Sequence, residues 1–311
     1  MTARGLPGGA VVLRAGTASA RVLTYGARIA ASSFGGAPVF VSYGDDADNR
    51  DDEAYLGAVL GRVSGRIGGA TLPMGDDRFD LDANAGDDQL HGGGAGFSRR
   101  VWDVAEAGAD RLVLTLASED GDQGFPGRLD ARVAFALREG ALRVDYEARA
   151  DAPTPVSLTH HPYVRLSGGD VLDHTVQANA AAWTPLTAAG IPTGEVRDVA
   201  GTPLDLSAPR RVGDVIGALT SRGEGGLDHG IVCPGGVRVA VSDGQRTLTV
   251  ASDQTHCQLF GAGTLGDPPG RHCGLAVEPQ GWPDAEKHEG FEGRVLRPGQ
   301  VYRRWVTYSV D

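Results

Sequence analysis

Short runs in which apolar residues stand together or alternate with polar ones recur from one end of the chain to the other. Alternation with a period of two places every second side chain on the same face, which is typical of strands that cover a core. The clearest case is 142–148, where Leu142, Val144 and Tyr146 share one face and charged residues occupy the other. We expect strands at 10–14, 21–25, 112–116, 132–137, 142–148, 237–241, 247–250 and 301–310.

Turn signals join several of these runs into hairpins. Glu139-Gly140 separates 132–137 from 142–148, and Asp243-Gly244 predicts a tight two-residue turn between 237–241 and 247–250. Helical periodicity is scarce, and only 52–60 and 212–219 favour short helices. Many short strands with Gly and Pro between them predict an all-β sandwich or barrel. No linker or repeat is visible, so we expect residues 1–311 to form a single domain.

Composition narrows the class of protein. Glycine provides 47 of the 311 residues, and the glycines fall between the apolar runs as turn residues do. The net charge is −11 and there is no basic stripe, so nucleic acid is not an expected partner. The three cysteines lie far apart, which fits reduced thiols in the cytoplasm. No signal peptide and no apolar run of about 18 residues is present, so no membrane partner is expected.

The stretch 276–284 (Ala-Val-Glu-Pro-Gln-Gly-Trp-Pro-Asp) contains the first candidate for chemistry. Glu278 follows an apolar run, and the Pro-rich segment after it is not expected to continue a regular strand. A carboxylate that faces a pocket floor is suited to general base work, whereas an ordinary solvated Glu at a strand end is the alternative.

Two histidine-bearing stretches add a possible proton donor. His91 precedes closely spaced glycines, where backbone can approach a ligand, although an incidental His in a Gly loop is the alternative. His160 and His161 are adjacent, so on an extended chain they point to opposite faces. A pocket histidine near its ordinary pKa of about 6.5 could donate a proton at neutral pH, and a structural histidine is the alternative. The pair lacks metal-ligand spacing, so no metal site is expected.

Two further stretches offer groups that could hold ligand oxygens. Asp228 lies between small residues and either accepts hydrogen bonds from hydroxyls or belongs to a turn. Arg62 and Arg66 stand four residues apart among glycines, as either a fork for ligand oxygens or a salt-bridged pair.

Taken together, these stretches resemble the aldose 1-epimerase (galactose mutarotase) family over nearly the whole chain. The likeness rests on six motifs in register: 61–67 (Gly-Arg-Val-Ser-Gly-Arg-Ile), 90–97 (Leu-His-Gly-Gly-Gly-Ala-Gly-Phe) followed by Trp102, 158–163 (Leu-Thr-His-His-Pro-Tyr), 191–195 (Ile-Pro-Thr-Gly-Glu), Asp228-His229, and 277–280 (Val-Glu-Pro-Gln) with Pro283-Asp284.

The resemblance implies a large antiparallel β-sandwich of the galactose mutarotase-like supersandwich type, with a sugar cleft on one sheet. It also implies interconversion of the α and β anomers of a free aldose without cofactor or metal. Glu278 would be the base that takes the C1 hydroxyl proton, and His161 the acid that protonates the ring oxygen. The residues that would bind the monosaccharide are His91, Arg66, Asp228, Gln280 and Tyr163, with Trp282 or Phe260 as the aromatic surface beneath the ring. A cytoplasmic monomer or homodimer is expected.

Departures from the family pattern leave several activities open. His160 replaces an Asn, Val164-Arg165 replaces Phe-Asn, and Gly65, Asp88 and Pro279 stand where the family has Asn, Asn and Thr. The acid and the base are retained, whereas the lost amides could change which sugar is preferred. A hexose-6-phosphate epimerase would need a cationic rim, for which Arg62, Arg99, Arg100 and Arg165 are candidates. A non-catalytic carbohydrate-binding module would be expected to lose the acid or the base, and the altered motif at 158–163 leaves open an activity on a lactone or oxidised sugar.

Overall fold

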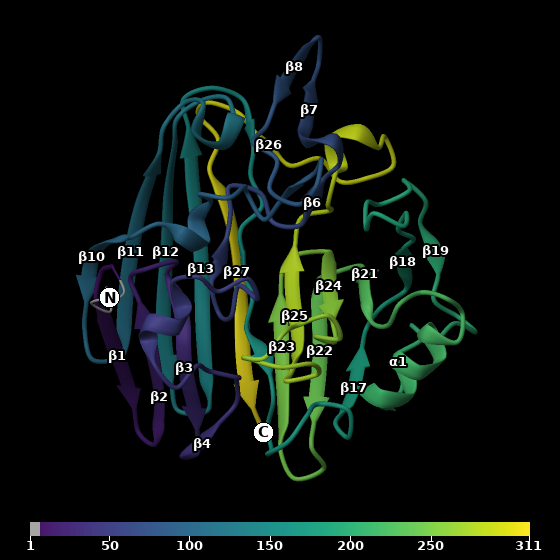
Figure 1. Cartoon of the computed structure of the whole chain (residues 1–311). Helices are drawn as coiled ribbons and strands as arrows, with labels where there is room; N and C mark the ends of the chain where they lie inside the picture. The colour runs from purple at the N-terminus through teal and green to yellow at the C-terminus, as the bar shows by residue number, and fades with distance from the viewer. Residues whose placement is uncertain (1–6) are drawn as a thin grey trace.

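Antiparallel sheets make up almost all of the regular structure in the computed structural model, which describes residues 7–311. The largest sheet has nine strands (Figure 1). In spatial order they are β10 (Asp103–Ala107), β11 (Arg111–Ser118), β12 (Leu129–Arg138), β13 (Ala141–Ala150), β27 (Tyr302–Val310), β23 (Thr247–Ser252), β22 (Val237–Ser242), β17 (Thr175–Ala178) and β20 (Arg210–Arg211).

Two smaller sheets pack against this large one. The first contains β1 (Ala10–Ala15), β2 (Ala18–Leu23), β3 (Arg28–Phe34) and β4 (Ala37–Pro38), and β1 and β2 contact β11 and β12. The second has six strands in the order β16 (Tyr163–Val164), β25 (Leu275–Gln280), β24 (His256–Phe260), β21 (Asp228–Val232), β18 (Ala182–Thr184) and β19 (Arg197–Asp198). Side chains from all three sheets share one apolar core.

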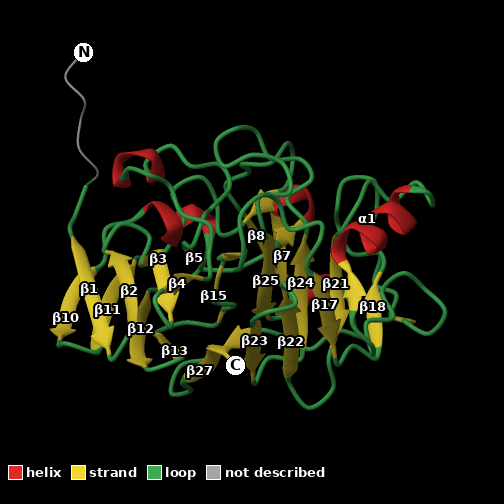
Figure 2. Ribbon diagram, turned by 90° about the horizontal axis from the view of Figure 1, so that it is seen from below, coloured by secondary structure: helices red, strands yellow, loops and turns green. Residues whose placement is uncertain are grey.

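Short pairs of strands and loops complete the chain. The pairs are β14 (Thr154–Pro155) with β26 (Val295–Leu296), β15 (Thr159–His160) with β5 (Val59–Leu60), β6 (Arg66–Ile67) with β9 (Gln89–Leu90), and β7 (Thr71–Met74) with β8 (Asp77–Asp80). Five 3₁₀ turns span Asp46–Asn49, Gly68–Ala70, Phe97–Arg99, Asp122–Gly124 and Ala285–Lys287. Figure 2 shows that the loops and helical turns gather on one side of the strand layers.

The expected all-β sandwich is confirmed, and so is most of the predicted pattern. β12 and β13 pair across the Glu139-Gly140 turn, and Leu142, Val144 and Tyr146 are buried on the inner face. The helix expected at 212–219 is α1 (Val212–Thr220), the one α-helix in the described part of the chain. No helix in the range 7–311 is long and apolar enough to cross a bilayer.

The helix expected at 52–60 is wrong. The carboxylate of Asp52, which is fully buried, accepts the backbone N–H of Ala54 at 2.8 Å and that of Leu56 at 2.6 Å. The same carboxylate contacts Arg28, and Tyr55 adopts a left-handed φ of 54°. A side chain that takes the backbone donors in this way competes with helical hydrogen bonds, so the segment folds as a loop.

Two local expectations also need correction. The turn after β22 has four residues because the Asp243 carboxylate accepts the N–H groups of Gln245 and Arg246 at 3.0 and 2.8 Å. β25 continues through Pro279 to Gln280 instead of ending at Glu278. Strand β16 pairs with β25 only at Leu275 and Ala276, so the missing N–H of Pro279 leaves no ladder partner unmet on that side.

Candidate active site

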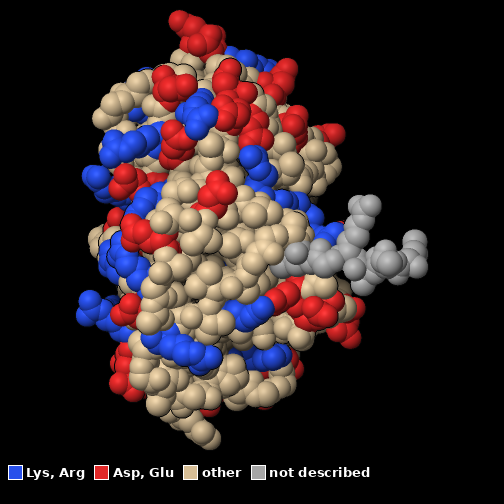
Figure 3. Space-filling model, turned by 90° about the vertical axis from the view of Figure 1, so that its left-hand side faces the viewer, with Lys and Arg blue, Asp and Glu red and all other residues tan. Residues whose placement is uncertain are grey.

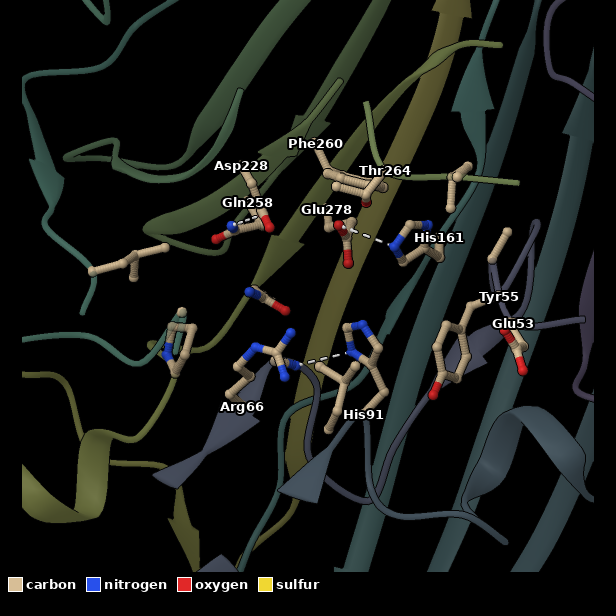
Figure 4. A pocket seen from close by; sticks show the side chains of 18 of the residues that line it. Glu53, Tyr55, Arg66, His91, His161, Asp228, Gln258, Phe260, Thr264 and Glu278 are labelled. Atoms are coloured by element: carbon tan, nitrogen blue, oxygen red, sulfur yellow. Dashed lines mark hydrogen bonds and ion pairs between the residues drawn. The ribbon is translucent and has the colours of Figure 1, made fainter. Parts of the chain in front are cut away.

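A cleft of about 230 Å³ lies on one face of the six-stranded sheet (Figure 4). The antiparallel register places residues of four strands in one row across its floor, because Thr184 opposes Gly230, Gly230 opposes Gln258, and Gln258 opposes Glu278. Side chains alternate between the two faces of a strand, so Asp228, two residues before Gly230, points to the same face. Strand pairing therefore gathers polar side chains that are up to about 90 residues apart in the sequence.

Glu278 and His161 face each other at the centre of the floor (Figure 4). The distance from His161 Nε2 to Glu278 Oε1 is 3.3 Å, and both side chains are buried. Burial raises the pKa of the Glu278 carboxyl well above its ordinary value, and the nearby Asp228 carboxylate raises it further. Burial also lowers the pKa of His161 to about 4. The expected histidine pKa near 6.5 is therefore wrong, because the low-polarity floor disfavours both charged forms.

The two adjacent histidines do point in opposite directions, as predicted. His160 Nδ1 lies 2.8 Å from Tyr146 Oη and its Nε2 lies 2.9 Å from the carbonyl of Ala27, on the side of the nine-stranded sheet. The ring of His161 instead packs at a tilt against the ring of Tyr163, with ring centroids 4.9 Å apart, and lines the cleft. The sequence alternation thus assigns one histidine to the core and the other to the candidate site.

The short β6–β9 pair places Arg66 and His91 on the wall opposite Glu278. His91 has a left-handed φ of 53°, and Gly92 after it lies so close to the chain that a Cβ would stand 1.9 Å from the carbonyl oxygen of Gly61. Only glycine can follow His91 at that distance. Burial, with the positive charge of Arg66 and the His161 ring close by, lowers the pKa of His91 well below its ordinary value.

One hydrogen bond sets the tautomer of His91. The backbone N–H of Gly65 donates to Nδ1 of His91 at 3.1 Å, so the neutral ring carries its proton on Nε2. Donor atoms of His91, His161 and Glu278 lie within 4.8 Å of one another and could in principle hold a metal. A metal binds an unprotonated ring nitrogen, and the unprotonated nitrogen of His91, Nδ1, already accepts the hydrogen bond from the Gly65 N–H. The His91 ring is better matched to a ligand oxygen that accepts a hydrogen bond.

Further polar and aromatic groups surround the pair. Gln258 donates from Nε2 to Asp228 Oδ1 at 2.7 Å, and both residues line the cleft. Gln280 and Phe260 line it as well, so the expected aromatic surface comes from Phe260. Trp282 is not part of the lining and packs on Phe291 with ring centroids 4.8 Å apart.

Two predicted residues make different contacts from those expected. The ring of Tyr163 lines the cleft, but its hydroxyl donates to the carbonyl of Ala54 at 2.9 Å. Arg62 is buried outside the cleft, where it donates to the carbonyl oxygens of Gly127 and Ser118 at 2.8 and 3.1 Å. The expected fork of Arg62 and Arg66 is therefore wrong, because Arg62 serves the fold.

Several lining residues are not identified by the sequence patterns. The main ones are Gln258, Glu53, Tyr55 and Thr184. Gln258 has a detectable signal, because it alternates with buried Cys257 and Leu259 on a strand beside Glu278. Tyr55, whose ring lies 4.8 Å from that of His91, has none, since its position depends on the loop that Asp52 fixes.

Known proteins share the family pattern and the fold of this chain. The family model for aldose 1-epimerase matches residues 9–309. Galactose mutarotase of Bos taurus is 34% identical over 277 residues, covering 83% of this chain and 80% of its own, and aldose 1-epimerase of Escherichia coli is 31% identical over 280 residues, covering 84% and 81%. The crystal structure of galactose 1-epimerase from Lactobacillus acidophilus superposes with a TM-score of 0.88 at 26% identity, covering 96% of this chain and 93% of that one. An aldose epimerase homologue from C. elegans has the same fold, with a TM-score of 0.88 at 23% identity over 97% and 98% of the two chains. This chain belongs to the aldose 1-epimerase family.

Proposed function

We propose that the cleft interconverts the α and β anomers of a free aldose by acid and base catalysis of ring opening and closing. As a member of the aldose 1-epimerase family, the chain is an isomerase that acts on a small sugar. The observation that carries the proposal is the Glu278–His161 pair, whose facing atoms are 3.3 Å apart on the cleft floor. Ring opening needs one group that takes a proton and one that gives a proton, and the pair supplies both.

In the proposed reaction, Glu278 takes the proton of the C1 hydroxyl while Nε2 of His161 gives a proton to the ring oxygen. The bond between C1 and the ring oxygen breaks, and C1 becomes an aldehyde carbon. Rotation about the C1–C2 bond then presents the other face of the aldehyde to the former ring oxygen. The two residues exchange roles as the ring closes, so no proton is gained or lost over the cycle.

Glu278 and His161 share one titratable proton between them. Before substrate binds, the cleft favours the uncharged forms of both residues, so this proton lies on Glu278. Within the described chain, Glu278 Oε2 and His161 Nδ1 are buried without any hydrogen-bond partner. A sugar hydroxyl that donates to Oε2 would stabilise the carboxylate and allow the proton to move to His161. Substrate binding would in this way prepare the base and the acid together.

The residues around the pair would hold the hydroxyl groups of the sugar. His91 Nε2–H, the Arg66 guanidinium and the Gln280 amide can donate hydrogen bonds, whereas the Asp228 carboxylate accepts them. The rings of Phe260 and Tyr163 provide apolar surface for the C–H face of a sugar.

The charges of the cleft favour a free sugar over a sugar phosphate. Arg66 is the one Arg or Lys among the described lining residues, and three carboxyl groups, those of Glu53, Asp228 and Glu278, share the cleft with it. None of the candidates Arg62, Arg99, Arg100 and Arg165 lines the cleft. Arg100 pairs with Asp122 at 2.8 Å and Arg165 donates to the carbonyl of Gly169 at 3.2 Å. Arg99 lies near the lining residue Tyr55, where its positive charge opposes the rise in the Tyr55 pKa that burial causes. A phosphate dianion would therefore meet net negative charge.

We also propose that the enzyme works in the cytoplasm and has no nucleic-acid partner. Three buried free thiols support a cytoplasmic location. On the face drawn in Figure 3, basic and acidic side chains are interspersed, which supports the absence of a nucleic-acid partner. A single domain over residues 1–311 and a monomeric or homodimeric state remain predictions.

The test is anomer exchange measured by NMR on a panel of free aldoses and hexose 6-phosphates, with wild type and Glu278→Gln compared. We expect wild type to accelerate the exchange of at least one free sugar, and the Gln variant to lose that acceleration. Acceleration of the phosphates alone would favour a hexose-6-phosphate epimerase. An exchange rate equal to that of buffer for every sugar would contradict the proposal.

A further inference from the structure

A buried histidine and a glutamate lie on the reverse face of the six-stranded sheet, directly behind Asp228. Successive residues of a strand point to opposite faces, so His229 points away from the cleft that Asp228 lines. Its ring lies 5.7 Å from that of Trp183 and is almost fully shielded from solvent. His229 Nε2 is 2.9 Å from Glu224 Oε2, and its Nδ1 is 3.2 Å from the backbone nitrogen of Asp228.

These two contacts fix the direction of the hydrogen bonds. The backbone N–H of Asp228 can only donate, so Nδ1 of His229 accepts and the ring proton lies on Nε2. Nε2–H then donates to the Glu224 carboxylate, which is the acceptor that this tautomer requires. The His229 side chain is 6% exposed and the Glu224 side chain 28%, so the hydrogen bond joins a buried ring to a carboxyl group at the edge of the solvent. Glu224 therefore holds the His229 ring, and the ring holds the first backbone donor of β21.

The segment that carries Glu224 has little else to fix it against the sheet. Gly223, Gly225 and Gly226 adopt left-handed φ values of 80°, 68° and 116°, and glycine gives such a loop wide conformational freedom. Within the described structure, the contact between Glu224 and His229 is the one side-chain hydrogen bond from residues 222–226 to β21. Replacement of the Glu224 carboxylate would therefore leave Nε2–H of His229 without its acceptor and the ring less firmly held.

The peptide group between Leu227 and Asp228 is held at both of its ends. Its carbonyl oxygen accepts the N–H of Gly261 at 2.8 Å, and its N–H donates to His229. Fixing this peptide fixes the direction in which the Asp228 side chain leaves the backbone. In the observed arrangement that side chain meets Gln258 on the cleft floor.

We propose that Glu224 and His229 are positioning residues that aim the Asp228 carboxylate at the sugar from behind the sheet. The inference rests on the proposed function, in which Asp228 accepts hydrogen bonds from sugar hydroxyls. Neither Glu224 nor His229 lines the cleft, so neither is a catalytic residue. Loss of the pair weakens sugar binding, whereas proton transfer between Glu278 and His161 continues.

Two readouts on the whole 311-residue chain test the inference: anomer exchange kinetics, and hydrogen exchange of the Asp228 backbone amide. The variants are Glu224→Ala, Asp228→Asn and the two combined. We expect Glu224→Ala to raise KM about threefold to tenfold while kcat changes by less than about twofold, since one hydrogen-bonded contact to the sugar is misaligned. The Asp228 amide should exchange faster in this variant. In the Asp228→Asn background, Glu224→Ala should raise KM no further, because both changes act through the same carboxylate.

Matched controls separate positioning from general damage to the fold. Glu195→Ala removes an exposed carboxylate paired with Arg197 at 2.8 Å near the edge strand of the same sheet, and should leave KM unchanged. Glu224→Gln keeps an oxygen that can accept the Nε2–H hydrogen bond and should restore most of the affinity.

Three results would each overturn the positioning role. The effects of Glu224→Ala and Asp228→Asn on KM could be additive, kcat could fall as much as KM rises, or the exchange rate of the Asp228 amide could stay unchanged in Glu224→Ala. If wild type turns over no sugar, the proposed function fails, while hydrogen exchange at Asp228 still decides whether Glu224 holds this backbone.

Discussion

The neighbours His160 and His161 belong to two different regions of the molecule. His160 belongs to the core region, where it contacts Tyr146 on β13 and packs at 5.5 Å from the ring of Phe135 on β12. His161 belongs to the cleft region and meets Glu278 on β25. Both rings are buried, and burial lowers the pKa of each to about 4.

The difference between the two histidines lies in their unmet hydrogen bonds. Both ring nitrogens of His160 have partners, whereas Nδ1 of His161 has none in the described structure, and neither has Oε2 of the facing Glu278. Unmet buried polar atoms cost stability, and in the cleft region they mark the place where a polar ligand would complete the hydrogen bonds. Burial is thus the same for His160 and His161, and the hydrogen bonding of their rings is what separates the two. Location in the cleft is needed as well, because the buried Nδ1 of His256 has no partner within residues 7–311 either and His256 does not line the cleft.

Replacement of the cleft histidine should have the largest effect on activity. We expect His161→Gln to lower kcat by about a hundredfold to ten-thousandfold, the range that general acid–base groups contribute. Its melting temperature should stay near that of wild type, because no protein hydrogen bond of the ring except its contact with Glu278 is lost. Anomer exchange kinetics and thermal melting are measured on the same sample of His161→Gln. If this variant keeps wild-type activity, His161 is not the catalytic acid and does not differ in function from His160.

A cavity in the core region should give the opposite result. Leu142 on β13 is fully buried, and Leu142→Ala should reduce the free energy of unfolding by about 2–5 kcal/mol. Because Leu142 is not among the lining residues, kcat per folded molecule should not change. Urea unfolding combined with exchange kinetics at low temperature checks both parts. A loss of kcat without a loss of stability would show that the two regions are coupled.

A smaller effect is expected at the contact that satisfies His160. Tyr146→Phe leaves Nδ1 of His160 buried without its partner, which should cost about 1–3 kcal/mol of stability. The matched variant Tyr308→Phe removes a buried hydroxyl that has no partner in the described chain, and should cost less or nothing. Equal losses for both tyrosines in urea unfolding would contradict the importance of hydrogen-bond satisfaction.

The strands of the core region can be predicted from the sequence more fully than those of the cleft region. In the core region one face of each strand is covered, so Leu142, Val144 and Tyr146 alternate with charged residues and reveal the hairpin. All six residues of β25 are buried, so apolar and polar positions do not separate there and the pattern does not mark the end of the strand. Glu278 and His161 are candidates from their local sequence, Glu278 after an apolar run and His161 beside His160, whereas their roles as base and acid come from the resemblance to a known family.

Contacts between distant segments account for what the sequence does not reveal. Gln258 reaches the site through its register with Glu278, and Tyr55 through a loop that the Asp52 carboxylate fixes. The pKa values of His161 and Glu278 depend on burial, which a sequence pattern does not report. The spacing of Arg62 and Arg66 suggests a ligand fork, yet the carbonyl partners of Arg62 are more than 50 residues away.

The pH dependence of kcat/KM for wild-type anomer exchange tests the central claim, that Glu278 and His161 act as a pair with one shared proton. The one-proton state exists above the His161 pKa of about 4 and below the raised pKa of Glu278. Activity should therefore fall as the pH drops through about 4, where His161 gains a second proton for the pair. It should fall again only as the pH rises through a value well above the ordinary carboxyl range, where Glu278 loses the last proton. Circular dichroism at each pH confirms that the protein remains folded. An acid limb centred near about 6.5, as for an ordinary exposed histidine, would contradict the account.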